Sequence, residues 1–156
     1  MAMAADPSGG VIGIRQPIDH EGADVFNVPG ALTWNELQST GLTAAQPFYE
    51  QSFGWRWELN DATVDYWVTN LDAKTGDDKS NGGAMPLPAM APPGMPSMWF
   101  TYFAVDDCDA TLAMVNAIGG STLFEPMKMG PGRFAGIVDP VGGMFMVIAF
   151  DAPPEA

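Results

Sequence analysis

The segment Leu42-Thr-Ala-Ala-Gln-Pro-Phe-Tyr-Glu-Gln-Ser-Phe-Gly-Trp55 is the most informative stretch of the chain. Its apolar residues recur three and four positions apart, which predicts a helix with one buried face: Leu42, Ala45, Phe48, Tyr49 and Phe53. Thr43 and Gln46 have the spacing of a capping box at its start. Pro47 must then lie very early in the helix or kink it.

Strand candidates surround this helix, and the second half of the chain repeats the same order of elements. In the first half they cover residues 31–38, 55–59, 64–71 and 82–87. In the second half they cover residues 99–105, 121–124, 134–138 and 144–150, with a helix from Asp106 or Asp107 to about Ile118. Each half is therefore expected to run β-α-β-β-β.

Proline-rich sequence marks the expected boundaries. Residues 86–97 carry five prolines, a density that neither a helix nor a ladder tolerates. We therefore expect a domain over 30–150, made of a module at about 30–88, a linker at 86–97 and a module at about 98–150. Residues 1–29 would be an N-terminal extension and residues 151–156 a tail.

A short sequence repeat connects the two ends of the chain. Ala5-Asp-Pro-Ser-Gly-Gly-Val-Ile12 matches Val138-Asp-Pro-Val-Gly-Gly-Met-Phe145, and Asp-Pro-x-Gly-Gly before an apolar run predicts a turn into a strand. We expect residues 5–16 to form an extra strand that copies the last strand of a preceding unit. Such an apolar strand needs a partner, either a sheet edge of the same chain or a sister chain, and we expect a homodimer.

Composition limits the classes of function. The net charge of −13 repels phosphate backbones and argues against a nucleic-acid partner. The single cysteine, Cys108, excludes an internal disulfide and, with three neighbouring carboxylates, is expected to be a structural thiol. The single histidine, His20, lies in a polar segment and is expected to be solvated. Neither a membrane span nor a signal peptide is evident, so a cytoplasmic protein is expected.

The ordered motifs resemble the vicinal oxygen chelate superfamily, the group of glyoxalases, bleomycin resistance proteins and extradiol dioxygenases. The resemblance rests on four segments in the family's order: Leu42–Trp55, Phe103-Ala-Val-Asp-Asp-Cys-Asp-Ala110, Gly132-Arg-Phe134 and Asp139-Pro-Val-Gly-Gly143. It implies an α+β fold of two βαβββ modules, which form a curled mixed β-sheet cup with the helices outside. The opening also looks like the start of the second unit of a tandem glyoxalase-like protein.

The family's metal-ligand positions fall on residues that cannot bind a divalent metal. They map onto Trp34, Phe100, Met146 and, on or near it, Met85-Pro86. The resemblance therefore implies a protein without a metal cofactor that binds or sequesters an apolar or aromatic small molecule in the cup. Two alternatives stay open: a metal-dependent lyase, isomerase or dioxygenase-like enzyme with a divalent metal, or an association module of a tandem-type protein.

Alternation along the strands selects the candidate ligand contacts. Trp34, Glu36 and Gln38 share one strand face. The resemblance adds Phe100, Tyr102 and Met146 to this ligand site. Glu36 would orient the ligand or act as a general base with a raised pKa, unless it points to solvent or pairs with a base. Arg133, near the rim, would bind an anionic ligand or form a surface ion pair.

Overall fold

The computed structural model describes residues 1–19, 22–71 and 79–151 and divides into two compact units. Unit one contains Met1–Glu21 and Asn35–Trp99, and unit two contains Gly22–Trp34 and Phe100–Ala156. The first 21 residues thus belong with the first module, whereas the next 13 belong with the second. The sequence instead grouped residues 1–29 as one extension. His20 lies outside the described residues.

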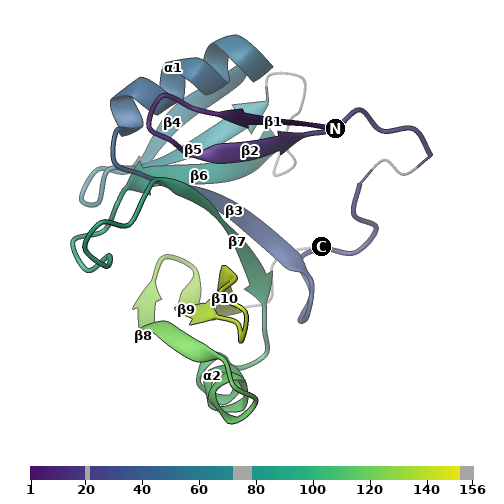
Figure 1. Ribbon diagram of the computed structural model, residues 1–156, viewed down its shortest axis with the longest axis vertical. Helices are drawn as coiled ribbons and strands as arrows, with labels where there is room; N and C mark the ends of the chain where they lie inside the picture. Colours follow the sequence, from purple (N-terminus) through teal and green to yellow (C-terminus); the bar gives the residue numbers. More distant parts are fainter. Residues whose placement is uncertain (20–21, 72–78, 152–156) are drawn as a thin grey trace. The chain divides into compact units, whose positions relative to one another are not determined.

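Unit one holds the first module, preceded by a hairpin (Figure 1). Its elements are β1 (Ala2–Ala5), β2 (Val11–Ile14), most of β3 (Leu32–Ser39), α1 (Leu42–Phe53), β4 (Trp55–Asp61), β5 (Tyr66–Leu71) and β6 (Ser80–Pro86). The module strands lie in the order β4-β5-β6-β3, with β3 parallel to β6 and the other pairs antiparallel.

Unit two repeats this plan. Its elements are most of β7 (Met98–Ala104), α2 (Cys108–Ala117), β8 (Ser121–Met129), β9 (Gly132–Val138) and β10 (Met144–Phe150). The strands lie in the order β7-β10-β9-β8, with one parallel pair, β7 with β10. The expected α+β fold with two βαβββ modules is therefore confirmed.

Aromatic side chains build the core of unit one. The buried face of α1, formed by Leu42, Ala45 and Tyr49, packs on Leu37 of β3 and Ala84 of β6. Partly buried hydrophobic residues surround this cluster, namely Ile12, Phe48, Phe53, Trp55, Trp57, Trp67 and Trp99. The ring of Tyr49 stacks on that of Trp55 with centroids 5.1 Å apart. The periodicity that predicted the helix therefore also identified the residues that bury it.

The start of α1 differs from the sequence expectation. The N-cap residue is Gly41, and it makes no side-chain cap bond. Thr43 already lies within the helix, so the expected capping box with Gln46 is wrong. The physical reason is that the helix begins at Leu42, one residue before the hydroxyl that would have capped it. Pro47 lies inside the helix.

Smaller side chains build the core of unit two. Cys108 and Leu112 of α2 pack on Ala135 and Ile137 of β9 and on Val147 of β10. The Asp107 carboxylate caps α2 by accepting a hydrogen bond of 2.9 Å from the backbone N–H of Ala110. Burial raises the pKa of the Cys108 thiol, as befits the expected structural role.

The N-terminal strand pairs within the chain. Residues 11–14 form β2, as expected, but the partner of β2 is β1, a strand that the sequence did not suggest. A bond of 2.8 Å from the Tyr49 hydroxyl to Asp6 Oδ2 joins this hairpin to α1. Trp99 Nε1 donates to the same hydroxyl at 2.8 Å. Burial, with Asp6 nearby, raises the pKa of Tyr49 above its ordinary value.

Candidate functional site

The strand register of unit one separates two faces of the sheet. Leu37 of β3 lies beside Ala84 of β6, and both belong to the core that α1 covers. Because neighbouring residues of a strand point to opposite sides, Glu36 and Gln38 lie on the face turned away from α1. Their register partners on β6 are Gly83 and Met85. We call this surface the helix-free face of unit one.

Glu36 and Gln38 form a buried polar pair on this face. Only 5% of Glu36 and 6% of Gln38 are exposed. The Gln38 amide Nε2 donates a hydrogen bond of 2.9 Å to Glu36 Oε1. The solvent-exposed alternative for Glu36 is therefore wrong, because this carboxylate is enclosed by protein. A buried carboxylate destabilises the fold unless hydrogen-bond donors surround it, and Gln38 supplies one such donor.

A second polar group on the same face was missed by the sequence analysis. Asn70 of β5 donates from Nδ2 to Glu58 Oε2 at 3.0 Å and accepts from Ser80 Oγ at 2.8 Å. Alternation places Asn70 on the side of Val68, which lies beside Gly83 in the register. Alternation within 64–71 was visible in the sequence. The cross-strand neighbours were not, because an irregularity in the β5–β6 register sets them.

The helix-free face of unit two is apolar. Tyr102 of β7 lies beside Met146 of β10 in a parallel register. The neighbouring residues Phe103 and Val147 point the other way, since Val147 belongs to the core under α2. Phe100 follows the alternation of Tyr102, and 1% of Phe100, 7% of Tyr102 and 1% of Met146 are exposed. Trp34, partly buried on β3, is assigned to the same unit.

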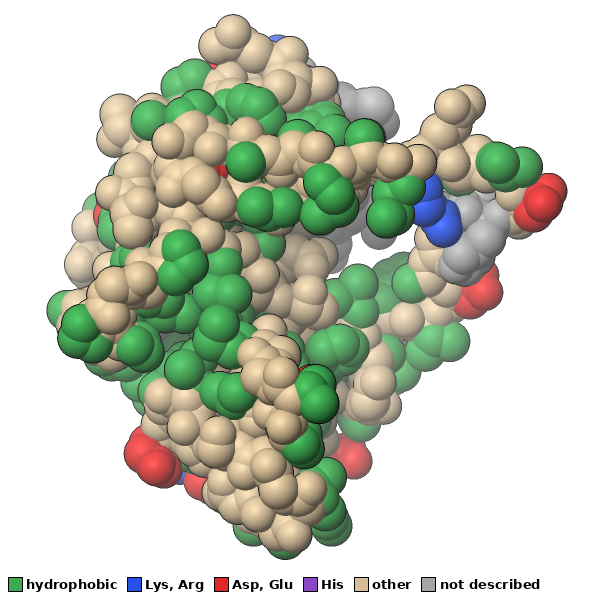
Figure 2. Space-filling model, viewed as in Figure 1, with side chains coloured by type: hydrophobic (Ala, Val, Ile, Leu, Met, Phe, Trp, Pro, Cys, Tyr) green, Lys and Arg blue, Asp and Glu red, His purple; other side chains and the backbone are tan. Residues whose placement is uncertain are grey.

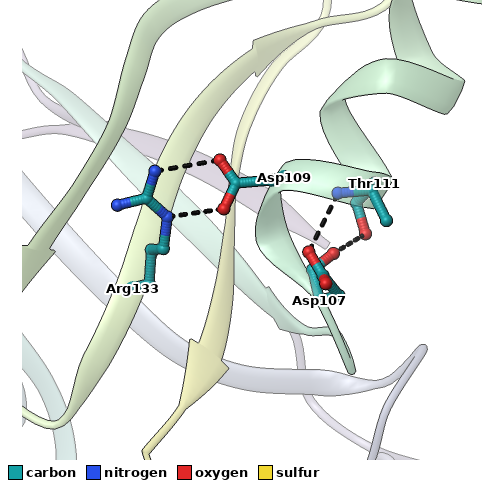
Figure 3. A network of polar contacts seen from close by, with 5 residues as sticks. Asp107, Asp109, Thr111 and Arg133 are labelled. Carbon is teal, nitrogen blue, oxygen red and sulfur yellow. Dashed lines mark hydrogen bonds and ion pairs between the residues drawn. The ribbon is translucent and has the colours of Figure 1, made fainter.

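Arg133 lies on the opposite, helix-covered side of unit two. It alternates with Phe134 and so shares a face with Ala135, which packs against α2. Its guanidinium makes a bidentate pair with Asp109 of α2, with Nε to Oδ2 at 2.7 Å and Nη2 to Oδ1 at 2.9 Å (Figure 3). This hydrogen bonding lowers the pKa of Asp109 and raises that of Arg133. The structure therefore shows the surface ion pair and does not place Arg133 beside Tyr102 and Met146.

The residues that the resemblance assigned to metal-ligand positions do not have the side chains of ligands for a hard or borderline divalent metal. Met85, Phe100 and Met146 are all buried side chains of the helix-free faces. They offer thioether or aromatic groups where a hard or borderline divalent metal requires oxygen or imidazole ligands. Within residues 1–19, 22–71 and 79–151, no three His, Cys, Asp or Glu side chains gather as a metal site would require. The absence of a metal cofactor stays a prediction.

Comparison with known proteins identifies the family. Residues 31–147 match the Glyoxalase/Bleomycin resistance protein/Dioxygenase superfamily, so the chain belongs to this superfamily. It is 37% identical over 150 residues to "Putative glyoxylase CFP32" of Mycobacterium tuberculosis, covering 95% of this chain and 55% of that protein. It is 35% identical over 152 residues to "Anthracycline biosynthesis protein DnrV" of Streptomyces peucetius, covering 95% and 52%. The chain thus spans about half the length of these relatives.

Solved structures share the fold. A Streptomyces coelicolor methylmalonyl-CoA epimerase aligns with a TM-score of 0.53 at 16% identity, over 83% of this chain and all of that one. A second structure, of a methylmalonyl-CoA epimerase in complex with methylmalonyl-CoA, aligns with a TM-score of 0.52 at 17% identity, over 80% of this chain and 97% of that one. Identities this low support the fold alone.

None of the described helices has both the length and the apolar character needed to cross a bilayer.

Proposed function

We propose that this chain is a small-molecule-binding member of its superfamily that works without a metal and takes an apolar or aromatic ligand on its helix-free faces. The residues proposed to contact the ligand are Trp34, Glu36, Gln38, Phe100, Tyr102 and Met146. Arg133 is left out because its guanidinium is paired with Asp109. Glu36 is the weak candidate for a catalytic base if the protein has an activity.

The buried Glu36–Gln38 pair is the observation that carries the proposal. Small-molecule sites combine large apolar groups with a few polar groups that fix orientation. In unit one the helix-free face carries the polar pair, and in unit two the helix-free face carries the buried apolar side chains Phe100, Tyr102 and Met146. Glu36 would accept a hydrogen bond from a hydroxyl or amine of the ligand, with Gln38 holding the carboxylate in place.

The ligand class follows from the side chains and agrees with one relative. Aromatic and thioether groups favour flat, polarisable molecules. The name of the Streptomyces peucetius relative connects it with the biosynthesis of anthracyclines, which are fused-ring aromatic compounds. A phenol or a hydroxylated polycyclic compound combines an aromatic surface with a hydroxyl donor for Glu36.

Isothermal titration calorimetry with a panel of phenols and hydroxylated polycyclic aromatics tests the proposal. Loss of a charge-assisted hydrogen bond in Glu36→Gln should cost about 1–3 kcal/mol of binding free energy. Glu50→Gln, an exposed glutamate on α1, is the matched control and should bind as the wild type does. If no compound of the panel binds, or if Glu36→Gln binds with unchanged affinity, the proposed site is wrong.

A metal-dependent lyase, isomerase or dioxygenase-like enzyme is the second candidate. The superfamily named by the match includes glyoxalases and dioxygenases, which favours it. Elemental analysis of the purified protein separates the two candidates. The metal-free proposal expects less than stoichiometric zinc, iron, nickel or manganese, and ligand binding that survives dialysis against a chelator. One metal ion per chain, lost together with binding, would contradict it.

We also propose that the chain forms a homodimer and that it acts in the cytoplasm. The support for association is the N-terminal hairpin, a short apolar ribbon with two edges that no further strand covers among the described residues. An association module of a tandem-type protein would use the same ribbon. Light scattering gives the mass directly, and a monomer at millimolar concentration would contradict the dimer.

A further inference from the structure

The N-terminal hairpin, defined as Ala2–Ile14, has the same turn as the hairpin of β9 and β10. In the first turn, Asp6 Oδ1 accepts from the backbone N–H of Ser8 at 2.7 Å and of Gly10 at 3.1 Å. In the second turn, Asp139 Oδ1 accepts from the N–H groups at the corresponding positions at 2.9 and 2.7 Å. The fourth residue of each turn is a glycine with positive φ, +96° at Gly9 and +95° at Gly142.

The strands beyond the turns also correspond. Ala5 pairs with Val11 just as Val138 pairs with Met144. One position further along the second strand, Ile12 packs on the core of unit one, and its counterpart Phe145 packs on the core of unit two. The N-terminal hairpin therefore turns the same face toward a helix-covered core as the C-terminal hairpin does.

The two hairpins differ at their edges. The outer edge of β9 pairs antiparallel with β8, and the outer edge of β10 pairs parallel with β7. Within the described part of the chain, β1 and β2 pair only with each other. A two-stranded ribbon by itself is only marginally stable in water, and the unpaired N–H and C=O groups of a free edge can pair with another strand.

The register shows which backbone groups the edge of β1 presents. The N–H of Asp6 donates across the hairpin to the carbonyl of Gly10 at 2.8 Å. Hydrogen-bonding direction alternates along an antiparallel strand, so Ala4 also bonds inward to β2. Met3 and Ala5 then direct their N–H and C=O groups outward, away from β2.

The surface around this edge suits contact between two copies of an acidic chain. The chain carries a net charge of −13, but residues 1–16 contain one carboxylate, Asp6, and 4% of this residue is exposed. The outward side chains are apolar, with 63% of Met3 and 51% of Val11 exposed. Hydrophobic side chains gather over β1 and β2 in the space-filling view (Figure 2). Two copies can approach here without bringing exposed carboxylates together.

We propose that the edge of β1 pairs antiparallel with the β1 edge of a second copy, which joins two hairpins into a four-stranded ribbon. A two-fold axis relates identical strands in antiparallel orientation. That is the orientation in which the corresponding strand, β9, is covered by β8. The β2 edge is the weaker candidate for antiparallel pairing, because its counterpart β10 pairs with a parallel strand, β7. This inference rests on the proposed homodimer and specifies the strands that form its interface. We call this contact between the two β1 edges the seam.

Size-exclusion chromatography with light scattering, over a range of concentrations, tests the seam. Met3→Pro removes one outward N–H and leaves the bonds to β2 in place, so it should convert the dimer to a monomer. Met3→Ala is the matched control. It keeps the backbone donor and should remain largely dimeric. Ala5→Lys, which places a charge on the same edge, is the second blocking variant and should also be monomeric.

The outcomes separate the seam from the other proposals. A wild-type monomer at all concentrations overturns the seam and the homodimer together, and leaves the edge to a strand of another protein. A dimer that persists in both Met3→Pro and Ala5→Lys overturns the seam alone. Calorimetry on Met3→Pro should return wild-type affinity for the aromatic panel, because Glu36 and Gln38 are not part of the hairpin.

Discussion

Units one and two follow the same βαβββ plan but place different chemistry on corresponding surfaces. The helix-free face of unit one carries the buried Glu36–Gln38 pair, whereas that of unit two carries Phe100, Tyr102 and Met146. Strand pairing depends mostly on the backbone, so the plan is retained while the outward side chains differ. The same backbone plan therefore carries a buried polar pair in one unit and buried apolar side chains in the other.

The cores of the two units also differ. Tyr49 of unit one is fully buried among tryptophans and bonds to Asp6 and Trp99, whereas unit two buries Leu112, Ala135 and Val147. A substitution in an aromatic core with a polar centre removes both packing contacts and hydrogen bonds. Unit one should therefore be the more sensitive of the two to a single substitution. Two pairs of variants test this, in order of decreasing effect, and a single variant of an exposed ion pair in unit two gives the lower limit.

Tyr49→Ala should be the most destabilising change. Removing a buried aromatic ring costs about 3–5 kcal/mol of unfolding free energy, and the Asp6 carboxylate and Trp99 N–H also lose their shared partner. Leu112→Ala in unit two should cost less, about 2–4 kcal/mol, because it leaves no polar group unpaired. Urea denaturation of both variants measures the difference. Equal losses would contradict the proposed asymmetry.

Gly10→Ala should be more destabilising than Gly143→Ala, although both occupy the last position of the repeated turn. A Cβ at Gly10 would lie 2.6 Å from Asp6 Oδ2 and 2.9 Å from Leu37 Cδ1, and both of those residues are buried. At Gly143 the close atoms belong to Asp139 alone, the nearest at 2.7 Å, and that side chain can move toward solvent.

Overpacking at Gly10 should lower the free energy of unfolding by about 1–3 kcal/mol, and the substitution at Gly143 should lower it by less. Thermal unfolding followed by circular dichroism ranks the two variants. A larger loss at Gly143 would show that the N-terminal hairpin is not held against the core as the structure indicates.

Asp109→Asn should have the smallest effect, because its pair with Arg133 is exposed. The pKa of Asp109 is lowered in the folded protein. The stability that the pair contributes is therefore present above the ordinary carboxyl pKa and is lost as pH falls through the lowered value. Acid titration of the wild type and Asp109→Asn should show curves that differ slightly at neutral pH and converge in acid. Asp139→Asn is an unsuitable control because Asp139 holds a turn.

Much of the fold was predictable because its signals are local. The 3.6-residue periodicity around Tyr49 identified α1, and the repeated Asp-Pro-x-Gly-Gly identified two turns that the structure shows to be alike. The capping box failed for an equally local reason. Thr43 has the right spacing to Gln46, but a glycine one residue before Leu42 already starts the helix.

The candidate site was only partly predictable. Alternation correctly grouped Glu36 with Gln38, since strand periodicity depends on neighbours in sequence. For Arg133 the sequence left two alternatives, an anionic ligand near the rim or a surface ion pair. The structure shows the ion pair with Asp109 of α2, a partner that sequence alone could not select among the many carboxylates. Asn70 was missed because its partners, Glu58 and Ser80, come from two other strands.

The sequence by itself predicted the order of the module elements and the repetition of the βαβββ module, because periodicity and turn chemistry act over a few residues. The resemblance of its ordered motifs to a known family indicated the superfamily. Tertiary structure alone decided that Ala2–Ala5 is a strand and that Asp6 bonds to Tyr49. It also decided that the Glu36 carboxylate is buried. Each of these depends on groups distant in the chain, which meet only when the hydrophobic faces pack and water is excluded from between them.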